Sequence, residues 1–463
     1  MLDAGTRGQL NSILIVGHEP LTEQMTGPTI RNWELAHALA QHTNVTLAVP
    51  GRPEVEASDF EVVGWEIGSL DGLVLTHDIV QASGYLLDIH PRLAAARFLV
   101  IDLYDPFPLE NLHMHVGATL EQRYRIAAQD RAVQMRSLRA GDVFLCASER
   151  QRDFWMGWLT AAGRVNPYLH SVDPGLERFL MVVPFGVPEV PPVLRQPRFR
   201  GEVSGISKED FLVIWGGGIW NWFDPLTLIR AADLTRDSLP HLRVLFPAPT
   251  SPSPEVLPMQ MSYEARRLSD EAGLTGSRVF FGSSWIPYRE HGSVLLESDV
   301  GISLHQNSVE TRMSFRTRIL DYLWAGLPII ATEGDSMADL VRADDLGAVV
   351  PAGSVEAVVA ALVELGTDSR RRSTCAKRSA AAASRFRWSV AARPLIDFCG
   401  APYRAPDRVV LRSESPTTPW DGRVVEPPPS RNVFARAAKV WRRDGLGGVV
   451  RRSWANLPGR QNP

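Results

Sequence analysis

The chain has 463 residues, of which 44% are hydrophobic and 22% are charged, and its formal net charge is −3. This length exceeds what one hydrophobic core usually fills, so we expect two domains of ordinary size with additional segments. The small negative charge excludes a generic nucleic-acid binder. Three cysteines at unrelated spacings predict neither a disulfide framework nor a zinc site. They favour a reducing, cytoplasmic compartment.

The chain opens with a strand, a loop, a helix and a second strand. Buried strands are predicted at residues 13–17 and 45–49, and the helix between them at 29–41. Gly27 lies in the loop, where backbone can approach a ligand closely. No Gly-x-Gly-x-x-Gly pattern follows the first strand, so this is not a dinucleotide fingerprint. No apolar run is long enough to predict a membrane span.

Polar side chains follow two further predicted strands, at residues 78–84 and 98–106. Ligands of α/β folds collect at the carboxyl ends of strands, so we expect an acceptor pocket there. Asp102 and Asp105 are its candidate catalytic carboxylates. The alternative for Asp102 is a structural role as a cap or a loop acceptor. The other candidate acceptor-binding residues are Gln81, Ser83 and Tyr104.

The first domain is expected to end near residue 187, before a stiff proline-rich linker at 188–197. A buried strand at 211–215 then leads into Gly216, Gly217 and Gly218, where backbone can approach a ligand. Trp220 and Trp222 either stack on a base or sugar or belong to the core. Strands at 242–246 and 279–282 and a helix at 263–272 continue the alternation.

The most informative stretch lies between residues 298 and 332. It reads as a strand, a polar loop from His305 to Ser314, a helix from Phe315 to Ala325 and a second strand. Gly326 suits a left-handed helix cap, and Pro328 prevents further helix. Arg316, Thr317 and Arg318 stand at the helix start. Free backbone N–H groups, the helix dipole and two guanidinium groups predict a diphosphate site there.

The segment Asp321–Ala331, DYLWAGLPIIA, resembles the nucleotide-sugar signature of retaining family-4 glycosyltransferases of the GT-B fold. The resemblance implies that Asp321 binds the ribose hydroxyls of the donor. The family usually has a glutamate eight positions earlier, where this chain has Met313, and Glu310 is near enough to replace it only if the loop shifts. The family also has a basic residue after its glycine-rich turn. This chain lacks it, which shifts charge neutralisation onto Arg316 and Arg318.

The resemblance covers roughly residues 12 to 398 and implies two Rossmann-like doubly wound α/β domains facing across a cleft, plus a basic helical tail. The expected parts are an acceptor domain (12–190), a nucleotide-sugar domain (205–385), a crossover helix back to the first domain (386–402), a flexible linker (403–430) and a basic amphipathic tail (431–463). The predicted donor-binding residues are Gly27, Gly217, Gly218, Arg316, Thr317, Arg318 and Asp321.

The implied function is transfer of a sugar from a nucleotide-diphosphate sugar to a hydroxyl of a glycan or lipid-linked acceptor, with retained configuration. We expect neither a metal nor another cofactor, because fixed cations and helix N–H groups can stabilise the leaving diphosphate. The alternatives are a nucleotide-sugar epimerase of the same fold and a catalytically degenerate sugar-nucleotide-binding module. An epimerase needs several converging acid/base groups, and the sequence shows no obvious set.

The last 33 residues carry eight basic residues against one acidic residue, Asp444. Val433, Phe434, Ala437, Val440 and Trp441 recur among them at helical spacing. A basic helix with an aromatic on its apolar side suits an anionic membrane surface, which predicts peripheral association with the inner face of a cell membrane in glycan assembly. The alternative is docking on the protein's own acidic body.

Overall fold

Two parallel β-sheets organise the chain in its computed structural model, which describes residues 11–66, 68–83, 85–248, 250–251 and 259–408. The first sheet has seven strands in the order β3-β2-β1-β4-β5-β6-β7. They are β1 (Ser12–Val16), β2 (Asn44–Pro50), β3 (Glu61–Trp65), β4 (Ile79–Ser83), β5 (Phe98–Asp102), β6 (Val143–Cys146) and β7 (Leu180–Val182). The order reverses between β1 and β4, and such a reversal is where ligands of α/β folds bind.

The second sheet has six strands in the order β10-β9-β8-β11-β12-β13, with its reversal between β8 and β11. They are β8 (Phe211–Ile214), β9 (Leu242–Phe246), β10 (Val279–Phe281), β11 (Val300–Ser303), β12 (Ile329–Thr332) and β13 (Gly347–Val350). All strand pairings described in the two sheets are parallel. The expected pair of doubly wound α/β domains is therefore confirmed.

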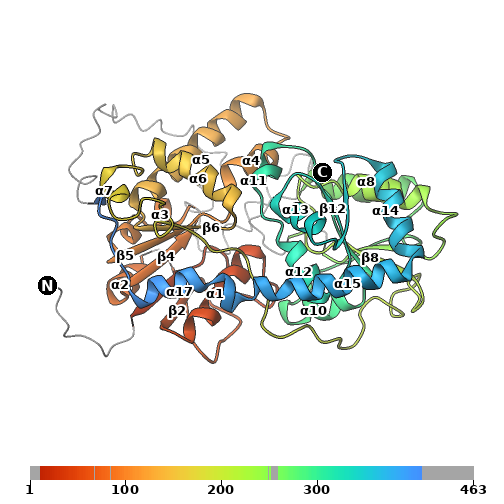
Figure 1. Cartoon of the computed structure of the whole chain (residues 1–463), viewed down its shortest axis with the longest axis horizontal. Coiled ribbons are helices and arrows are strands. Elements are labelled where there is room, and N and C mark those ends of the chain that lie inside the picture. The colour runs from red at the N-terminus through yellow and green to blue at the C-terminus, as the bar shows by residue number, and fades with distance from the viewer. Residues whose placement is uncertain (1–10, 67, 84, 249, 252–258, 409–463) are drawn as a thin grey trace, which may run out of the picture. The chain divides into compact units, whose positions relative to one another are not determined.

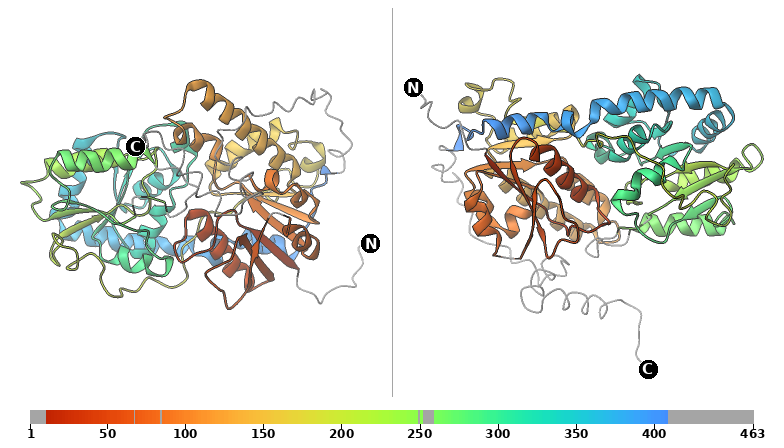
Figure 2. Two further views of the ribbon diagram at one scale, coloured as in Figure 1. Left: turned by 180° about the vertical axis from the view of Figure 1, so that it is seen from behind. Right: turned by 90° about the horizontal axis from the view of Figure 1, so that it is seen from below.

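Helices flank both sheets (Figures 1 and 2). In the first domain they are α1 (Gly27–Ala40), α2 (Leu70–Thr76), α3 (Leu86–Ile89), the 3-10 helix η1 (Pro91–Ala95), α4 (Phe107–Met114), α5 (Leu120–Ala140), α6 (Glu149–Ala161) and α7 (Pro167–His170). In the second they are α8 (Pro225–Leu234), α9 (Gln260–Glu271), α10 (Tyr288–Leu296), α11 (Val309–Met313), α12 (Thr317–Ala325), α13 (Ser336–Ala343), α14 (Val355–Thr367) and α15 (Ser369–Ala383).

The central strands are apolar on both sides because helices cover both faces of each sheet. Ile13, Leu14 and Ile15 of β1 are fully buried, as are Val300 and Ile302 of β11. The apolar runs of the sequence predicted these strands well. One short strand lies elsewhere: the segment 182–187 resembles the strand and turn that close the first domain in the family, but β7 spans Leu180–Val182 and ends where that segment begins.

The polar loop predicted from His305 to Ser314 contains the short helix α11. Its N-cap is Ser308, whose hydroxyl accepts a hydrogen bond from the backbone N–H of Thr311. Local capping thus stabilises a short helix here, although the sequence shows no apolar periodicity that would predict it. Helix α12 ends as predicted, because Gly326 has a φ of 65°, in the left-handed region.

After α15 the chain passes through η2 (Ser384–Phe386), α16 (Trp388–Ala391) and α17 (Arg393–Gly400). This segment contacts the first domain: Arg387 bridges Val187, and the side chain of Asn11 donates to the carbonyl of Cys399 at 2.6 Å. The Trp388 ring lies so close to Gly186 that a Cβ there would meet it at 2.5 Å. A glycine is therefore required where the crossover segment packs.

The predicted linker 403–430 needs a correction at its start. Arg404 donates to the carbonyl of Arg97, and Asp407 forms a fully buried two-point ion pair with Arg164 at 2.8 and 3.1 Å. Residues 403–407 are thus fastened to the first domain and do not belong to a linker. The rest of the predicted linker and the basic tail lie outside the described residues.

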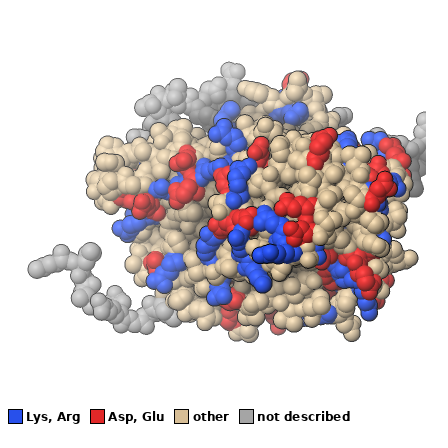
Figure 3. Space-filling view, turned by 45° about the vertical axis from the view of Figure 1, so that its right-hand side comes forward, with Lys and Arg blue, Asp and Glu red and all other residues tan. Residues whose placement is uncertain are grey.

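The surface of the described chain mixes charges of both signs. Figure 3 shows acidic and basic side chains interspersed on one face. Exposed or half-exposed ion pairs occur on the described surface, among them Arg371 with Asp345 at 2.6 Å and Arg342 with Glu333 at 3.1 Å. Such pairs add little stability. This face therefore lacks the broad basic stripe that nucleic-acid phosphates require.

Candidate active site

The glycine turn after β8 is held against α12 by one tyrosine. Tyr322 is fully buried, and its hydroxyl accepts from the N–H of Gly216 at 2.8 Å and donates to the carbonyl of Ile302 at 2.8 Å. Gly217 has a φ of 79°, and a Cβ there would meet nothing within 4 Å. The turn therefore adopts a left-handed conformation beside open space, as close approach to a ligand requires.

Arg318 lies behind this turn as a buried cation that forms no ion pair with any residue that the structure describes. Its Nη2 donates to the carbonyl of Gly218 at 3.0 Å, and its guanidinium stacks 3.9 Å from the centre of the Phe223 ring. Its Nη1 is buried without a hydrogen-bond partner among the described residues. Burial lowers the pKa of Arg318 to about 10. A buried charge without a counter-ion is costly, so this position favours an anion.

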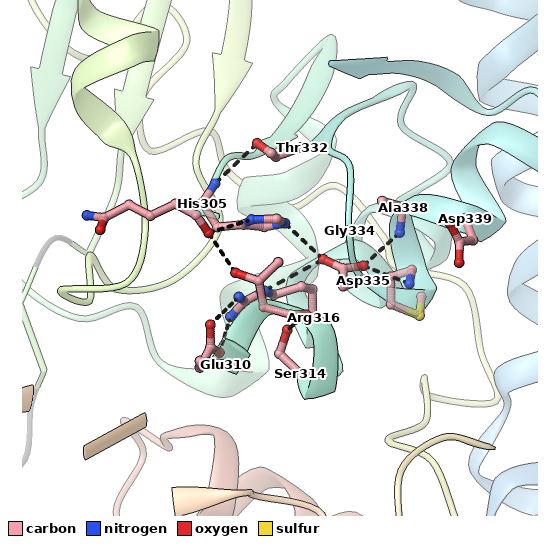
Figure 4. A network of polar contacts seen from close by, with 12 residues as sticks. His305, Glu310, Ser314, Arg316, Thr332, Gly334, Asp335, Ala338 and Asp339 are labelled. Atoms are coloured by element: carbon pink, nitrogen blue, oxygen red, sulfur yellow. Dashed lines mark hydrogen bonds and ion pairs between the residues drawn. The ribbon is translucent and has the colours of Figure 1, made fainter. Parts of the chain in front are cut away.

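Arg316, unlike Arg318, has an acidic partner. Its Nη1 and Nη2 donate to the two oxygens of Glu310 at 2.9 and 2.7 Å, and both side chains are buried (Figure 4). The predicted contact of Arg316 with a diphosphate stays a prediction, and the geometry favours a structural role. Both carboxylate oxygens of Glu310 accept hydrogen bonds from Arg316. Glu310 is therefore poorly placed to replace the glutamate that the family has at the position of Met313.

A buried histidine–aspartate pair completes this network. His305 Nε2 lies 3.1 Å from Asp335 Oδ2, which is also 3.7 Å from Arg316 Nε (Figure 4). The other oxygen of Asp335 accepts from the N–H groups of Met337 and Ala338 at 2.8 Å and caps α13. The sequence did not predict this network of His305, Asp335 and Arg316. The only signal was an aspartate before an apolar helix, which is the ordinary signature of a cap.

Asp321 lies in the middle of α12 with a side chain that is 37% exposed. Its Oδ2 is 3.1 Å from His291 Nε2, on α10. Burial lowers the pKa of His291, but the charge and the hydrogen bond of Asp321 outweigh it and raise that pKa above its usual value. Thr317 is the first residue of α12. The ribose-binding role of Asp321 stays a prediction, with His291 as a neighbour that the sequence analysis did not name.

The first domain brings the predicted acceptor residues together. Gln81 Nε2 is 3.4 Å from Asp102 Oδ2, the backbone N–H of Tyr104 donates to Asp102 Oδ1 at 3.2 Å, and Ser83 is the strand partner of Asp102. Arg31, which the sequence analysis missed, holds Asp102 at 2.7 and 3.1 Å. Both oxygens of Asp102 are therefore occupied. Its catalytic role stays a prediction, and the geometry favours the structural alternative.

Asp105 has a carboxyl neighbour in Glu110, which lies in the first turns of α4. Asp105 Oδ1 is buried and has no hydrogen-bond partner among the described residues. Burial raises the pKa of Asp105 to about 6 and that of Glu110 well above its usual value, and the charge of the Asp105 carboxyl raises the pKa of Glu110 further. Glu110 was missed because its distance of five residues from Asp105 carries no recognisable pattern.

The predicted acceptor residues of the first domain and the glycine turn of the second domain lie near the junction of the two domains, where several contacts join the domains. Gln151 is fully buried, and its amide nitrogen donates at 2.9 Å to the carbonyls of both Tyr104 and Met313. On the other side, Trp285 Nε1 donates to the carbonyl of Met25 at 3.0 Å. A Cβ on Gly218 would lie 3.4 Å from the Trp285 ring. The loop that leads into Gly27, the first residue of α1, thus approaches the glycine turn of the second domain.

In the described part of the chain, no group of three or more His, Cys, Asp or Glu side chains is arranged to hold a metal ion. No described helix is long and apolar enough to cross a membrane.

No protein-family model matches the sequence, and no curated protein matches it. Solved structures do match. Sucrose-phosphate synthase from Thermosynechococcus elongatus covers 87% of this chain and 100% of its own, with a TM-score of 0.60 and 16% identity. Trehalose-6-phosphate synthase OtsA covers 85% and 100% with a TM-score of 0.62 and 11% identity. Anabaena HepE, solved with UDP and glucose, covers 85% and 100% with a TM-score of 0.58 and 16% identity.

Identities this low establish the fold alone. The chain therefore has the two-domain GT-B architecture that the resemblance implied, matched over the full length of each of these structures.

Proposed function

We propose that the protein is a glycosyltransferase that moves a sugar from a nucleotide-diphosphate sugar to an acceptor hydroxyl, with retention of configuration. The observation that carries the proposal is Arg318, a buried guanidinium whose Nη1 has no partner among the described residues, set beside the open turn at Gly217 and the start of α12. A diphosphate supplies the anion that this cation lacks, and its oxygens fit backbone N–H groups at a helix start.

In this proposal the second domain holds the donor. Arg318 and the first N–H groups of α12 bind the diphosphate, Gly217 and Gly218 let it approach the backbone, and Asp321 binds the ribose. Arg318 replaces the pair of arginines that the sequence suggested, because Glu310 occupies Arg316. The fixed cation stabilises the leaving nucleoside diphosphate, so we propose that the reaction needs no metal and no other cofactor.

The acceptor is held by the first domain, with Asp105 as the carboxylate that faces its reacting hydroxyl and Gln81, Ser83 and Tyr104 around it. Neighbouring structures support the donor class, since HepE was solved with UDP-glucose and an E. coli trehalose-6-phosphate structure was solved with UDP-2-fluoro glucose. We propose a glycan or lipid-linked acceptor. A membrane surface as partner of residues 431–463 is tested by liposome sedimentation, and unchanged sedimentation after their deletion would contradict it.

The proposal is tested by thermal unfolding with UDP-, GDP-, ADP-, CMP- and TDP-sugars. One nucleotide class should stabilise the protein. Arg318→Ala should weaken its binding about 10- to 100-fold, which corresponds to the loss of one or two charged hydrogen bonds. Arg318→Lys keeps the charge and controls for folding, and Arg230→Ala, on an exposed side chain of α8, controls for charge. Equal affinity in Arg318→Ala and Arg230→Ala would refute the donor site.

Asp105 and Glu110 favour a second candidate function. An epimerase needs converging acid/base groups, and burial raises the pKa values of both Asp105 and its neighbour Glu110. Product analysis separates the two functions. A transferase releases the nucleoside diphosphate, by transfer or by slow hydrolysis, whereas an epimerase returns an isomeric sugar. Binding without either product would identify a degenerate module.

A further inference from the structure

We propose that Trp220 is a specificity-determining residue whose indole ring stacks on the pyranose ring of the donor, beside the diphosphate. The inference deepens the proposed function and rests on it. In the sequence, Trp220 and Trp222 are equal candidates for stacking on a ligand or for the core. The structure separates them: Trp222 is only 5% exposed and belongs to the core of the second domain, whereas Trp220 is half-buried.

The Trp220 ring is supported on one face by a core residue. The rings of Trp220 and Trp222 are parallel, with 4° between their planes and 5.6 Å between their centres. Among the described residues, no other aromatic ring stacks on Trp220 and no guanidinium group lies over it. Its second face therefore has no aromatic or cationic partner. Aromatic faces bind pyranose rings through the C–H groups on one side of the sugar, which meet the electron-rich face of the ring.

The indole N–H of Trp220 lacks a partner beside the glycine turn. Its Nε1 lies 3.6 Å from the position of a Cβ built on Gly218. It makes no hydrogen bond to a described residue, and it is not among the buried atoms without a partner, so it is accessible to solvent. Indole N–H groups in partly buried sites usually have an acceptor. Sugar hydroxyls and phosphate oxygens are both acceptors, so a nucleotide sugar at this turn would supply one.

The position of Trp220 favours the sugar over the nucleobase. The strand order reverses between β8 and β11, so right-handed connections place α8 and α12 on opposite faces of the second sheet (Figure 1). Asp321, the proposed ribose ligand, lies on α12. Trp220 lies in the segment between the glycine turn and α8. A diphosphate at the turn would therefore direct its nucleoside toward Asp321 and its sugar toward Trp220.

A second indole contacts the same turn but is already engaged. The ring of Trp285 lies 3.4 Å from the position of a Cβ on Gly218, and its Nε1 donates to the carbonyl of Met25 in the first domain at 3.0 Å. Trp285 thus joins the two domains beside the turn. Trp220 is the indole at the turn whose N–H remains available to a ligand.

The test compares two ligands by isothermal titration calorimetry of the full chain: the nucleotide sugar that thermal unfolding selects and its free nucleoside diphosphate. Trp220→Ala should weaken binding of the nucleotide sugar about 3- to 10-fold, as expected for the loss of one aromatic contact, and change binding of the nucleoside diphosphate by less than about twofold. Trp220→Phe keeps a stacking ring and should retain most of the affinity. Trp158→Ala, which removes a half-buried indole of α6, is the matched control and should change neither affinity.

A measurement on the wild-type protein tests the contact without a substitution. In saturation-transfer NMR, irradiation of aromatic protons should saturate the C–H protons of the sugar ring. Saturation confined to the base and the ribose would overturn the stacking. Equal losses of both ligands in Trp220→Ala, or no loss of either, would also overturn it while leaving the proposed function intact. If no nucleotide sugar and no nucleoside diphosphate binds the wild type, the proposed function fails and this inference fails with it.

Discussion

Buried ionisable side chains divide this site into structural and functional residues. Arg31 with Asp102 and Arg316 with Glu310 are buried two-point ion pairs, so each of these arginines has a counter-charge. Arg318 forms no ion pair with a described residue, and its Nη1 and Asp105 Oδ1 have no hydrogen-bond partner among the described residues. A buried charge or carboxyl group that is not fully satisfied costs stability, and such costs concentrate at functional sites.

Asp102 and Asp105 lie three residues apart, but removing the charge of each should change the free energy of unfolding in opposite directions. Burial raises the pKa of Asp105 to about 6, so between its usual value and pH 6 the folded protein binds a proton that the unfolded chain has released. Stability therefore falls as the pH rises through this range. Asp105→Asn should raise the free energy of unfolding at pH 8 by about 2 kcal/mol and change it little at pH 4.

Asp102→Asn should instead destabilise the protein, by about 3 kcal/mol, because it leaves Arg31 buried without its counter-charge. Urea unfolding of Asp105→Asn and Asp102→Asn at pH 4 and pH 8 checks both predictions. Equal effects of the two substitutions at pH 8 would contradict the division between a structural and a functional aspartate.

At the scale of elements, the proposed donor site depends on how α12 packs against the glycine turn. Tyr322 fastens the turn to α12 and to the end of β11, so the backbone groups at both helix start and turn are held before any ligand arrives. Two left-handed glycines flank this unit. Gly217 lies beside the site, and Gly326 ends the same helix at its far side.

Alanine at either glycine should cost about 1 kcal/mol of stability, because both have a positive φ. Only Gly217→Ala should also reduce the thermal shift produced by the nucleotide sugar, since its Cβ would enter the open space beside the turn. Parallel unfolding curves with and without donor measure both effects. A loss of donor binding in Gly326→Ala as large as in Gly217→Ala would show that the effect is general instability.

At the scale of the whole molecule, single buried side chains join distant segments. Gln151 links the loop after β5 to the loop before α12, and Arg164 with Asp407 fixes the end of the described chain to the first domain. Gln151 thus connects the loop of the first domain that contains Tyr104 with Met313 of the second domain. The proposed acceptor and donor halves of the site are joined by hydrogen bonds between residues far apart in sequence.

Gln151→Leu should leave the carbonyls of Tyr104 and Met313 and the N–H of Ala147 without their present partner. We expect a loss of about 2–4 kcal/mol in the free energy of unfolding. Turnover should fall more than donor affinity, because the donor site lies within the second domain. Gln122→Leu, at an exposed capping position of α5, is the control for losing an amide. If Gln151→Leu lowered the donor affinity as much as the turnover, the prediction that Gln151 acts outside the proposed donor site would be contradicted.

The sequence by itself determined the architecture. Apolar runs such as Ile13–Val16 and Val300–Ser303 are buried on both faces and could form only the central strands of helix-covered parallel sheets. The glycines at 217 and 326 likewise predicted local backbone that side chains resist. These properties follow from periodicity and local sterics, which a sequence displays directly.

Only the tertiary structure decided which charged residues are free. Arg316 and Arg318 look equivalent in sequence, yet Glu310 neutralises one and nothing described neutralises the other. Asp102 and Asp105 look equivalent too, until Arg31 from α1 and Glu110 from α4 distinguish them. The reason is physical: a side chain's charge state and availability depend on burial and on partners that folding brings from other elements.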